Sequence, residues 1–193
     1  MERDRAIELN PATVEPWRER GALHWNRRNL DHAHADFNNA LVQAPDDLLA
    51  TAGRGQVLAE LGQAGTALKD LERAAGLAED GGALYAQAQA GRGLALATQG
   101  QFSEAWPAFE AALGARPDSG RTFVYRAQAR QLDGDITAAL ADYERALTAA
   151  DPPLPPAYRR WIEHMTANIG PTHATRSPWA RLVSWLRTRL SPG

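Results

Sequence analysis

A pattern of small and large residues recurs along the chain with a period of 34 residues, and this period limits the possible folds more than any other feature. The alignment has a small-residue column, an alanine column, a large-residue column and a second alanine column. Their members are Gly21, Gly55, Gly93 and Ala127; Ala33, Ala67, Ala105 and Ala139; Phe37, Leu71, Phe109 and Tyr143; and Ala40, Ala74, Ala112 and Ala146. The steps are 34, 38 and 34 residues, so one four-residue insertion falls between the second and third units. Such a period is typical of a solenoid built from one repeated supersecondary unit.

The chemistry of the columns predicts helical hairpins. Small residues such as Gly21 and Ala33 let two antiparallel helices approach closely, and Ala40 lets the following helix lie against them. The large residue, Phe37 in the first unit, fills the space between one pair and the next. One hairpin cannot bury its own apolar face, whereas a stack of hairpins has a continuous core. We therefore predict an all-α solenoid of stacked antiparallel helix pairs.

These columns resemble the tetratricopeptide repeat family from about Val14 to Asp151. Pro45 and Pro117 close the second helices of repeats one and three, as the family pattern expects, but Glu79 departs from it in repeat two. Asp151 takes the place of the proline in repeat four. The resemblance implies a right-handed superhelix that acts as a non-enzymatic adaptor for a protein or peptide partner.

The repeats suggest a division of the chain into segments. We expect a partial repeat or capping helix at 1–13, repeats at 14–47, 48–81, 86–119 and 120–153, a C-terminal capping helix at 154–170, a linker at 171–177 and a basic amphipathic helix at 178–193. The first segment is ambiguous because residues 5–11 match the pattern of residues 39–45. The chain therefore either begins inside a repeat of a longer protein or starts with a lone capping helix.

Composition excludes several classes of protein. The chain has no cysteine, so disulfides and thiolate metal sites are excluded. It has no apolar run long enough to span a membrane and no apolar stretch behind its charged start, so we expect a cytoplasmic protein. Arginine supplies 20 of the 21 basic residues, which is typical of a GC-rich bacterial genome.

The sequence offers little for catalysis, and we predict no enzyme activity, no cofactor and no metal site. His32 and His34 lie two residues apart on a helix, so they point in different directions and make a poor ligand pair with His24 nearby. The Gly-Arg-Gly triplets at 53–55 and 91–93 fall in the close-packing column, so packing explains them better than phosphate binding. Acidic pairs such as Asp46-Asp47 fall in turns, where helix capping accounts for them.

The first helix of each repeat should face the concave groove. The predicted groove residues are Arg18, Trp25, Asn26, Gln56, Leu94, Val124, Gln128 and Gln131, interleaved with Ala22, Ala52, Ala59, Ala90 and Ala97. The family's carboxylate-gripping version uses Lys, Asn and Arg here, and no such basic clamp is present. A mostly apolar or neutral groove suits an amphipathic helix or an extended apolar peptide. The alternative is that the alanines serve only as helix formers.

Charge is divided along the chain. Residues 158–193 carry a net charge of +5, whereas residues 1–157 carry −7. A uniform basic surface for nucleic acid is therefore absent, and we predict no nucleic-acid partner.

The last helix is predicted to be a docking element. It places Trp179, Leu182, Val183, Leu186 and Leu190 on one side and Arg181, Arg187 and Arg189 outside or bordering that stripe. Three surfaces compete for it: the acidic solenoid, an anionic membrane surface as a peripheral contact, and another copy of the chain, unless it stays disordered. The alternative function is therefore an accessory or regulatory segment of a larger protein.

A charge pair also recurs. In each repeat an arginine precedes the small-residue column, and in repeats one, two and four an aspartate stands sixteen residues after that arginine. This spacing predicts ion pairs across these hairpins: Arg20–Asp36, Arg54–Asp70 and Arg126–Asp142. In repeat three Ala108 replaces the acid, so Arg92 should lack this partner. The functional alternative is an arginine ladder for an acidic ligand.

Overall fold

The computed structural model describes residues 13–78, 81–149 and 152–168, and these contain nine α-helices and no strand. The helices are α2 (Val14–Asn26), α3 (Leu30–Gln43), α4 (Leu48–Glu60), α5 (Ala64–Leu77), α6 (Ala83–Thr98), α7 (Phe102–Ala115), α8 (Gly120–Leu132), α9 (Ile136–Thr148) and α10 (Pro156–Asn168). The predicted all-α fold is confirmed, and α6, with 16 residues against 13 in α4, takes up most of the four-residue insertion.

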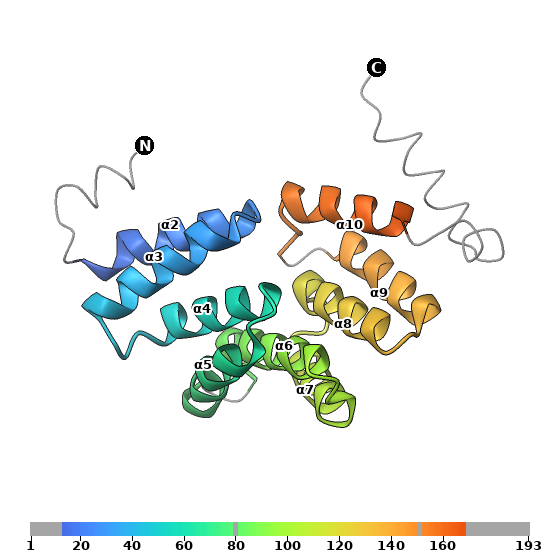
Figure 1. Ribbon diagram of the computed structural model, residues 1–193, viewed down its shortest axis with the longest axis horizontal. Helices are drawn as coiled ribbons and strands as arrows, with labels where there is room; N and C mark the ends of the chain where they lie inside the picture. Colours follow the sequence, from blue (N-terminus) through green and yellow to red (C-terminus); the bar gives the residue numbers. More distant parts are fainter. Residues whose placement is uncertain (1–12, 79–80, 150–151, 169–193) are drawn as a thin grey trace, which may run out of the picture.

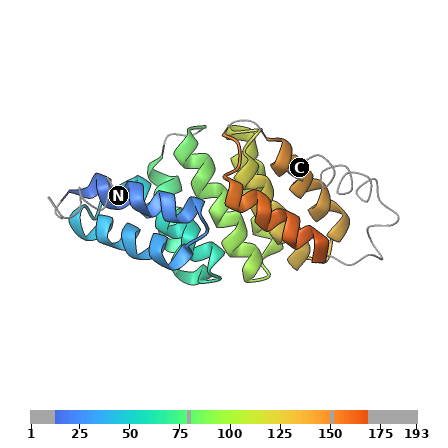
Figure 2. The same ribbon diagram turned by 90° about the horizontal axis from the view of Figure 1, so that it is seen from above.

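The helices form four antiparallel hairpins that follow one another along an arc. Figure 1 shows the even-numbered helices on the inside of the arc, with α2 and α10 facing each other at its two ends. Figure 2 shows the same hairpins succeeding one another along the long axis of the molecule. Each first helix packs on its own second helix and on the first helix of the next hairpin, as α4 does on α5 and α6.

The large-residue column forms the core between hairpins, as predicted. Phe37, Leu71, Phe109 and Tyr143 are at most 2% exposed. The small-residue column allows the close approach: a Cβ atom at Gly55 would lie 2.7 Å from Leu71 Cγ. At Gly93 it would lie 2.8 Å from the ring of Phe109. Neither position therefore accepts a side chain without movement of the core.

The two Gly-Arg-Gly triplets are packing elements, as the sequence analysis favoured. Within the first triplet, Gly55 contacts the large residue of its own hairpin, and Gly53 faces Phe37 of the preceding hairpin, where a Cβ atom would lie 2.6 Å from the ring. Gly91 likewise meets Leu71 of the preceding hairpin. Each glycine pair thus brings a first helix against two large side chains at once.

The three predicted ion pairs are present and bidentate. Arg20 Nε and Nη2 donate to Asp36, Arg54 donates to Asp70 in the same way, and Arg126 donates to Asp142, all at 2.7 to 2.9 Å. Arg92 lacks such a pair, as expected: its Nε lies 3.9 Å from Glu72 on the preceding hairpin. Because the three arginines already have carboxylate partners, they do not form a free ladder for an acidic ligand.

Candidate functional site: the concave face

The inside of the arc is not an open groove along its whole length. A set of aromatic and charged side chains from both ends of the arc meets around Glu60, at the end of α4. We call this set the Glu60 cluster: Trp25, Asn26, Arg28, Glu60, Arg121, Tyr125, Tyr158 and Trp161. They come from α2 and the turn after it, from α4, from α8 and from α10. The cluster therefore joins residues far apart in the sequence, as in the contact of Arg28 with Trp161.

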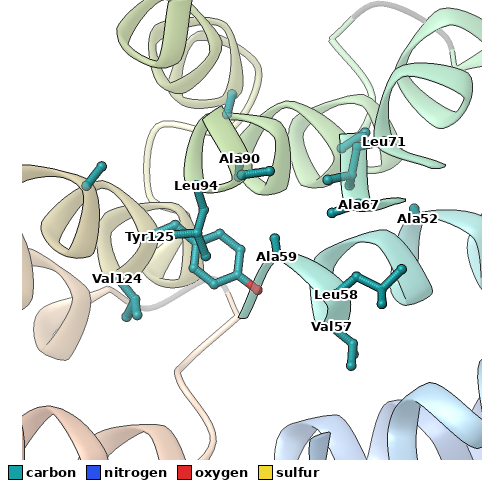
Figure 3. Packing of buried hydrophobic residues seen from close by; sticks show 14 of the residues in the cluster. Ala52, Val57, Leu58, Ala59, Ala67, Leu71, Ala90, Leu94, Val124 and Tyr125 are labelled. Carbon is teal, nitrogen blue, oxygen red and sulfur yellow. The ribbon is translucent and has the colours of Figure 1, made fainter. Parts of the chain in front are cut away.

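Glu60 is the acceptor at the centre of the cluster, and its side chain is only 1% exposed. Its Oε1 accepts hydrogen bonds from Trp25 Nε1 at 2.7 Å and from the hydroxyls of Tyr125 and Tyr158 at 2.6 Å each. Its Oε2 accepts from Arg28 Nη1 at 2.9 Å. Figure 3 shows the ring of Tyr125 reaching from α8 toward α4 beside Ala59, with its hydroxyl toward the end of α4. Each carboxylate oxygen thus has a donor from the chain itself.

Arg121 is the second charged group at the centre of the cluster. Its guanidinium lies 3.6 Å from the ring centre of Trp25 and 4.5 Å from that of Tyr158. It donates to the Tyr158 hydroxyl and to Asn26 Oδ1, both at 2.9 Å. Its Nη1 lies 3.9 Å from Glu60 Oε1, so the two buried charges compensate each other.

Arg28 ties the first hairpin to the capping helix. Its guanidinium lies 4.5 Å from the ring centre of Trp161 and 4.9 Å from that of Tyr158, while it donates to Glu60. Such cation–π contacts add to the ion pair where water is excluded. The two ends of the arc are therefore held together by the concave face itself.

Burial and charge set the protonation of the tyrosines in the cluster. Burial, with a further contribution from the charge of Glu60, raises the pKa of Tyr125 well above its ordinary value. Burial likewise raises the pKa of Tyr158, and the charge of Arg121 opposes this only in part. Both hydroxyls therefore stay protonated and act as donors to Glu60 across the physiological range.

Beside the cluster the concave face holds a cavity of about 300 Å³. It lies between α2, α4, α6 and α8, and a proline-rich segment at 152–155 closes one side. Its lining residues are Ala22, Trp25, Asn26, Gln56, Ala86, Gln87, Ala90, Arg116, Ser119, Gly120, Arg121, Thr122, Pro152, Pro153, Leu154 and Pro155. The alanines leave the space that this cavity occupies. Its volume is at the lower end of the range for small-ligand sites.

Gln56, like Thr122, is a buried polar side chain in the lining of this cavity, at 1% exposed. Its Nε2 donates to the main-chain carbonyl of Gln87 at 2.7 Å, while its Oε1 is buried without a hydrogen-bond partner among the described residues. A buried acceptor in this state carries a cost in free energy. Gln56 therefore adds a buried acceptor without a partner to the packing beside the cavity.

The predicted groove residues have different positions in the structure. Trp25, Asn26 and Gln56 line the cavity, as do Ala22 and Ala90.

Leu94 and Val124, by contrast, are at most 2% exposed and belong to the core between helices. Figure 3 shows both among the packed apolar side chains. Ala52, Ala59 and Ala97 are buried in the same core.

The polar members of the predicted groove are mostly engaged with the chain itself. Arg18 forms an ion pair with Asp47 at 2.6 Å, and Gln131 accepts a hydrogen bond from Tyr143. Gln128 is partly exposed. Arg116 and Arg121 also line the cavity, so this part of the face is more basic than the mostly neutral groove expected from the sequence.

Sequence reasoning missed four members of the cluster. Glu60 and Arg121 stand in columns where the repeats share no residue type. Arg28 and Tyr125 replace glycines that other repeats share, namely Gly62, Gly100 and Gly134 for Arg28 and Gly53 and Gly91 for Tyr125. Departures from the repeat pattern were therefore the available signal.

Two other predictions about sites concern helix capping and metals. Asp47 accepts a hydrogen bond from Ala50 N at 2.8 Å and caps α4, as predicted for the acidic turn. Among residues 13–78, 81–149 and 152–168, no group of His, Asp or Glu is arranged to hold a metal ion. Within the same residues, no helix has the length and apolarity needed to cross a membrane.

The predicted docking helix falls outside the described residues. This applies to Trp179, Arg181, Leu182, Val183, Leu186, Arg187, Arg189 and Leu190, and to the linker before them. The predicted segment at 1–13 lies outside them as well, except for its last residue.

A comparison with family models finds the tetratricopeptide repeat. The model matches residues 18–83, 54–120 and 90–155 in three overlapping copies, which together span the four hairpins. No curated protein matches the sequence significantly.

Solved structures of similar fold include PilW, described as a widely conserved type IV pilus biogenesis factor. It is 22% identical, with a TM-score of 0.60, over 77% of this chain and 67% of that one. A thermophilic tetratricopeptide repeat protein of Thermus thermophilus is 18% identical, with a TM-score of 0.59, over 72% and 75%. MamA of Desulfovibrio magneticus is 20% identical, with a TM-score of 0.54, over 75% and 80%. At these identities the likeness concerns the fold alone.

Proposed function

The chain belongs to the tetratricopeptide repeat family, whose members are generally non-enzymatic scaffolds for protein interaction, and we propose that it binds an extended apolar segment of a partner protein in its concave cavity. The observation that carries the proposal is the cavity of about 300 Å³ lined by Trp25 and by alanines of α2 and α6. We place this interaction in the cytoplasm, in line with the sequence analysis.

The size and the walls of the cavity favour an extended segment over a helix. An α-helix with its side chains has a diameter of about 10–12 Å and needs an open trough. Here Arg121 bonds to Asn26, and Arg28 stacks on Trp161, across the arc. An extended strand of peptide is thinner and presents alternate side chains to a wall, which suits a pocket beside this closure.

A selection experiment tests the proposal. A phage-displayed library of random dodecamer peptides is selected on the purified protein, and the recovered peptides are synthesised and titrated by calorimetry. Apolar sequences without helical periodicity are the expected result. Ala22→Arg then fills the cavity from a partly exposed position on its wall.

The matched control is Ala35→Arg, which places the same side chain at an exposed position of α3. Binding at the cavity predicts a loss of about tenfold or more in affinity with Ala22→Arg and a change within about twofold with Ala35→Arg, where tenfold corresponds to about 1.4 kcal/mol. Circular dichroism checks that both variants are folded. Equal affinities for the two variants would contradict the proposal.

A further inference from the structure

α10 does not continue the stack as the first helix of a fifth hairpin would. Within the described residues, α8 has long backbone contacts with α6 and α9, whereas α10 has only a short one with α9 and none of greater extent with any other helix. Figure 1 shows α10 at the end of the arc, facing α2. The contacts that position α10 are therefore mostly made by its side chains.

Two aromatic side chains of α10 reach into the Glu60 cluster. The Tyr158 hydroxyl donates to Glu60 Oε1 at 2.6 Å and accepts from Arg121 Nη1 at 2.9 Å. Three residues later, the ring centre of Trp161 lies 4.5 Å from the guanidinium of Arg28. Because residues three apart are neighbours on a helix, this pair contacts both arginines from one face of α10.

The surface under α10 has a chemistry of its own. Arg28, Glu60 and Arg121 come from other elements, and their side chains are at most 20% exposed. They combine one carboxylate with two guanidinium groups, beside the rings of Trp25 and Tyr125. Such a surface favours an aromatic ring that stacks on a guanidinium and a hydroxyl that donates to the carboxylate while it accepts from an arginine. A tyrosine next to a second aromatic side chain has both properties.

The segment at 152–155 joins α10 to the stack. Three of its four residues are prolines, which have no N–H to donate. Its buried residue is Leu154, whose Cγ would lie 3.1 Å from a Cβ atom at Gly120. A helix tethered by a short segment competes with a free one at an effective concentration on the order of millimolar.

We propose that α10 is an internal ligand of this surface, and that a partner helix with the same pair, a tyrosine and an aromatic residue three positions later, binds here by displacing it. The inference goes beyond the proposed function, because the cavity takes an extended segment while α10 is in place. The surface of Arg28, Glu60 and Arg121 takes a helix once α10 has left. The apparent affinity of such a partner is its intrinsic affinity multiplied by the fraction of chains in which α10 is displaced.

A synthetic peptide of residues 152–168 tests this on the full chain. The peptide carries a dye at its N-terminal end and is titrated by fluorescence anisotropy with the parent chain and with Tyr158→Ala/Trp161→Ala. We expect at least about tenfold tighter binding to the double variant, because its own α10 competes less well for the surface. The control is Arg160→Ala/Glu163→Ala, which changes two exposed positions of the same helix and should bind the peptide within about twofold of the parent.

Changes in the peptide test which groups the surface recognises. With Tyr158→Phe in the peptide, the ring remains but the hydroxyl is lost, and we expect about fivefold weaker binding to the double variant of the chain. With Tyr158→Ala/Trp161→Ala in the peptide, binding should be at least about twentyfold weaker.

Circular dichroism checks that the double variant of the chain is folded. If it is not, Tyr158→Phe in the full chain takes its place, since it removes only the hydroxyl, and the native peptide should then bind about fivefold more tightly than to the parent.

Four results would overturn the inference: the peptide binds none of the chains, it binds the parent and the α10 variants equally, its aromatic residues make no difference, or the control variant gains as much affinity as the α10 variants. Each would mean that α10 is a fixed part of the fold. The selection of peptides for the cavity is independent of this test, so the proposed function and the role of α10 stand or fall separately.

Discussion

Glu60 and Gln56 lie one turn apart on the same face of α4, yet their surroundings are opposite. Glu60 receives donors from α2, α8 and α10 and from the turn after α2, so both of its oxygens are bonded. Gln56 has one bond, from its nitrogen, and its oxygen faces no partner among the described residues. A shift of four residues along one helix thus separates a saturated polar centre from an unsaturated one.

The difference indicates that the two side chains contribute to stability with opposite signs. A buried network in which every group is bonded favours a single arrangement of the elements that supply it. The Glu60 cluster therefore keeps the arc closed, and the helices around the cavity are held in position by it. A buried acceptor without a partner, as at Gln56, adds a cost in free energy instead. A stabilising and a destabilising polar group therefore occupy neighbouring turns of α4.

The largest expected effect on stability comes from a substitution in the Glu60 cluster. Glu60→Gln removes the charge that compensates Arg28 and Arg121, whose side chains are at most 20% exposed. Loss of one partner from a buried ion pair costs roughly 3–5 kcal/mol, and we expect the free energy of unfolding in urea to fall by about this amount. The control is Glu72→Gln, an exposed position 3.9 Å from Arg92, with an expected loss of about 1 kcal/mol or less. Equal losses in the two variants would mean that the cluster does not hold the arc closed.

Glu60→Gln should also weaken the contacts between the two ends of the arc. Because the chain has no cysteine, spin labels can be placed at two exposed positions, Asn29 and Glu163, on opposite sides of the closure. A single narrow distance distribution is expected for the parent chain and a broader one for Glu60→Gln. A distribution that stays narrow would mean that the cluster stabilises the fold without holding the arc closed.

The fold could be predicted from the sequence because it depends on what the repeats share. Phe109 and Gly93 meet within one hairpin, and Arg54 meets Asp70 sixteen residues along the chain. Contacts of this kind recur in each repeat, so four copies of the pattern support one another. The one exception, Arg92 opposite Ala108, was equally visible in the alignment.

The closure could not be predicted in the same way. Arg121 meets Asn26 across 95 residues, and this contact depends on the curvature of the whole arc, which no single repeat determines. Arg28 and Tyr125 also interrupt glycine columns, and an argument from shared residues passes over such positions. Of the residues expected in the groove, Trp25 and Gln56 line the cavity, whereas Leu94 and Val124 are buried in the core.

On the cavity side, Gln56→Leu is expected to change the free energy of unfolding by about 1 kcal/mol or less. The variant loses the bond to the Gln87 carbonyl, but it also removes a buried acceptor that has no partner. These two contributions have opposite signs. Urea denaturation beside Glu60→Gln gives the direct comparison, and a loss as large as that of Glu60→Gln would show that the bond to the Gln87 carbonyl outweighs the cost of the acceptor without a partner.

A smaller effect is expected for the Arg–Asp ion pair of the hairpins, which three repeats have and repeat three lacks. Ala108→Asp should restore in repeat three the pair that Arg20, Arg54 and Arg126 make elsewhere. Because the side chain of Arg92 is 29% exposed, the gain should be only about 0–1 kcal/mol. Ala108→Asn has the same size without the charge, so the difference in urea midpoint between the two variants measures the pair. A midpoint for Ala108→Asp at or below that of Ala108→Asn would show that no pair forms.

The smallest expected effect concerns His24, whose Nδ1 is also buried without a partner among the described residues. Burial lowers the pKa of His24 below its ordinary value of 6.5, and the attraction of Asp36, 3.9 Å away, offsets this only in part. A lowered pKa means that folding favours the neutral ring. This contribution to stability is therefore complete above the unfolded-state pKa and is lost as the pH falls from about 6.5 toward the folded-state pKa.

Imidazole resonances followed by NMR should give His24 a midpoint below 6.5. The decrease in melting temperature between pH 7 and pH 5 should be slightly smaller in His24→Gln, since glutamine does not titrate, and an equal decrease in both proteins would show that His24 is satisfied in either form.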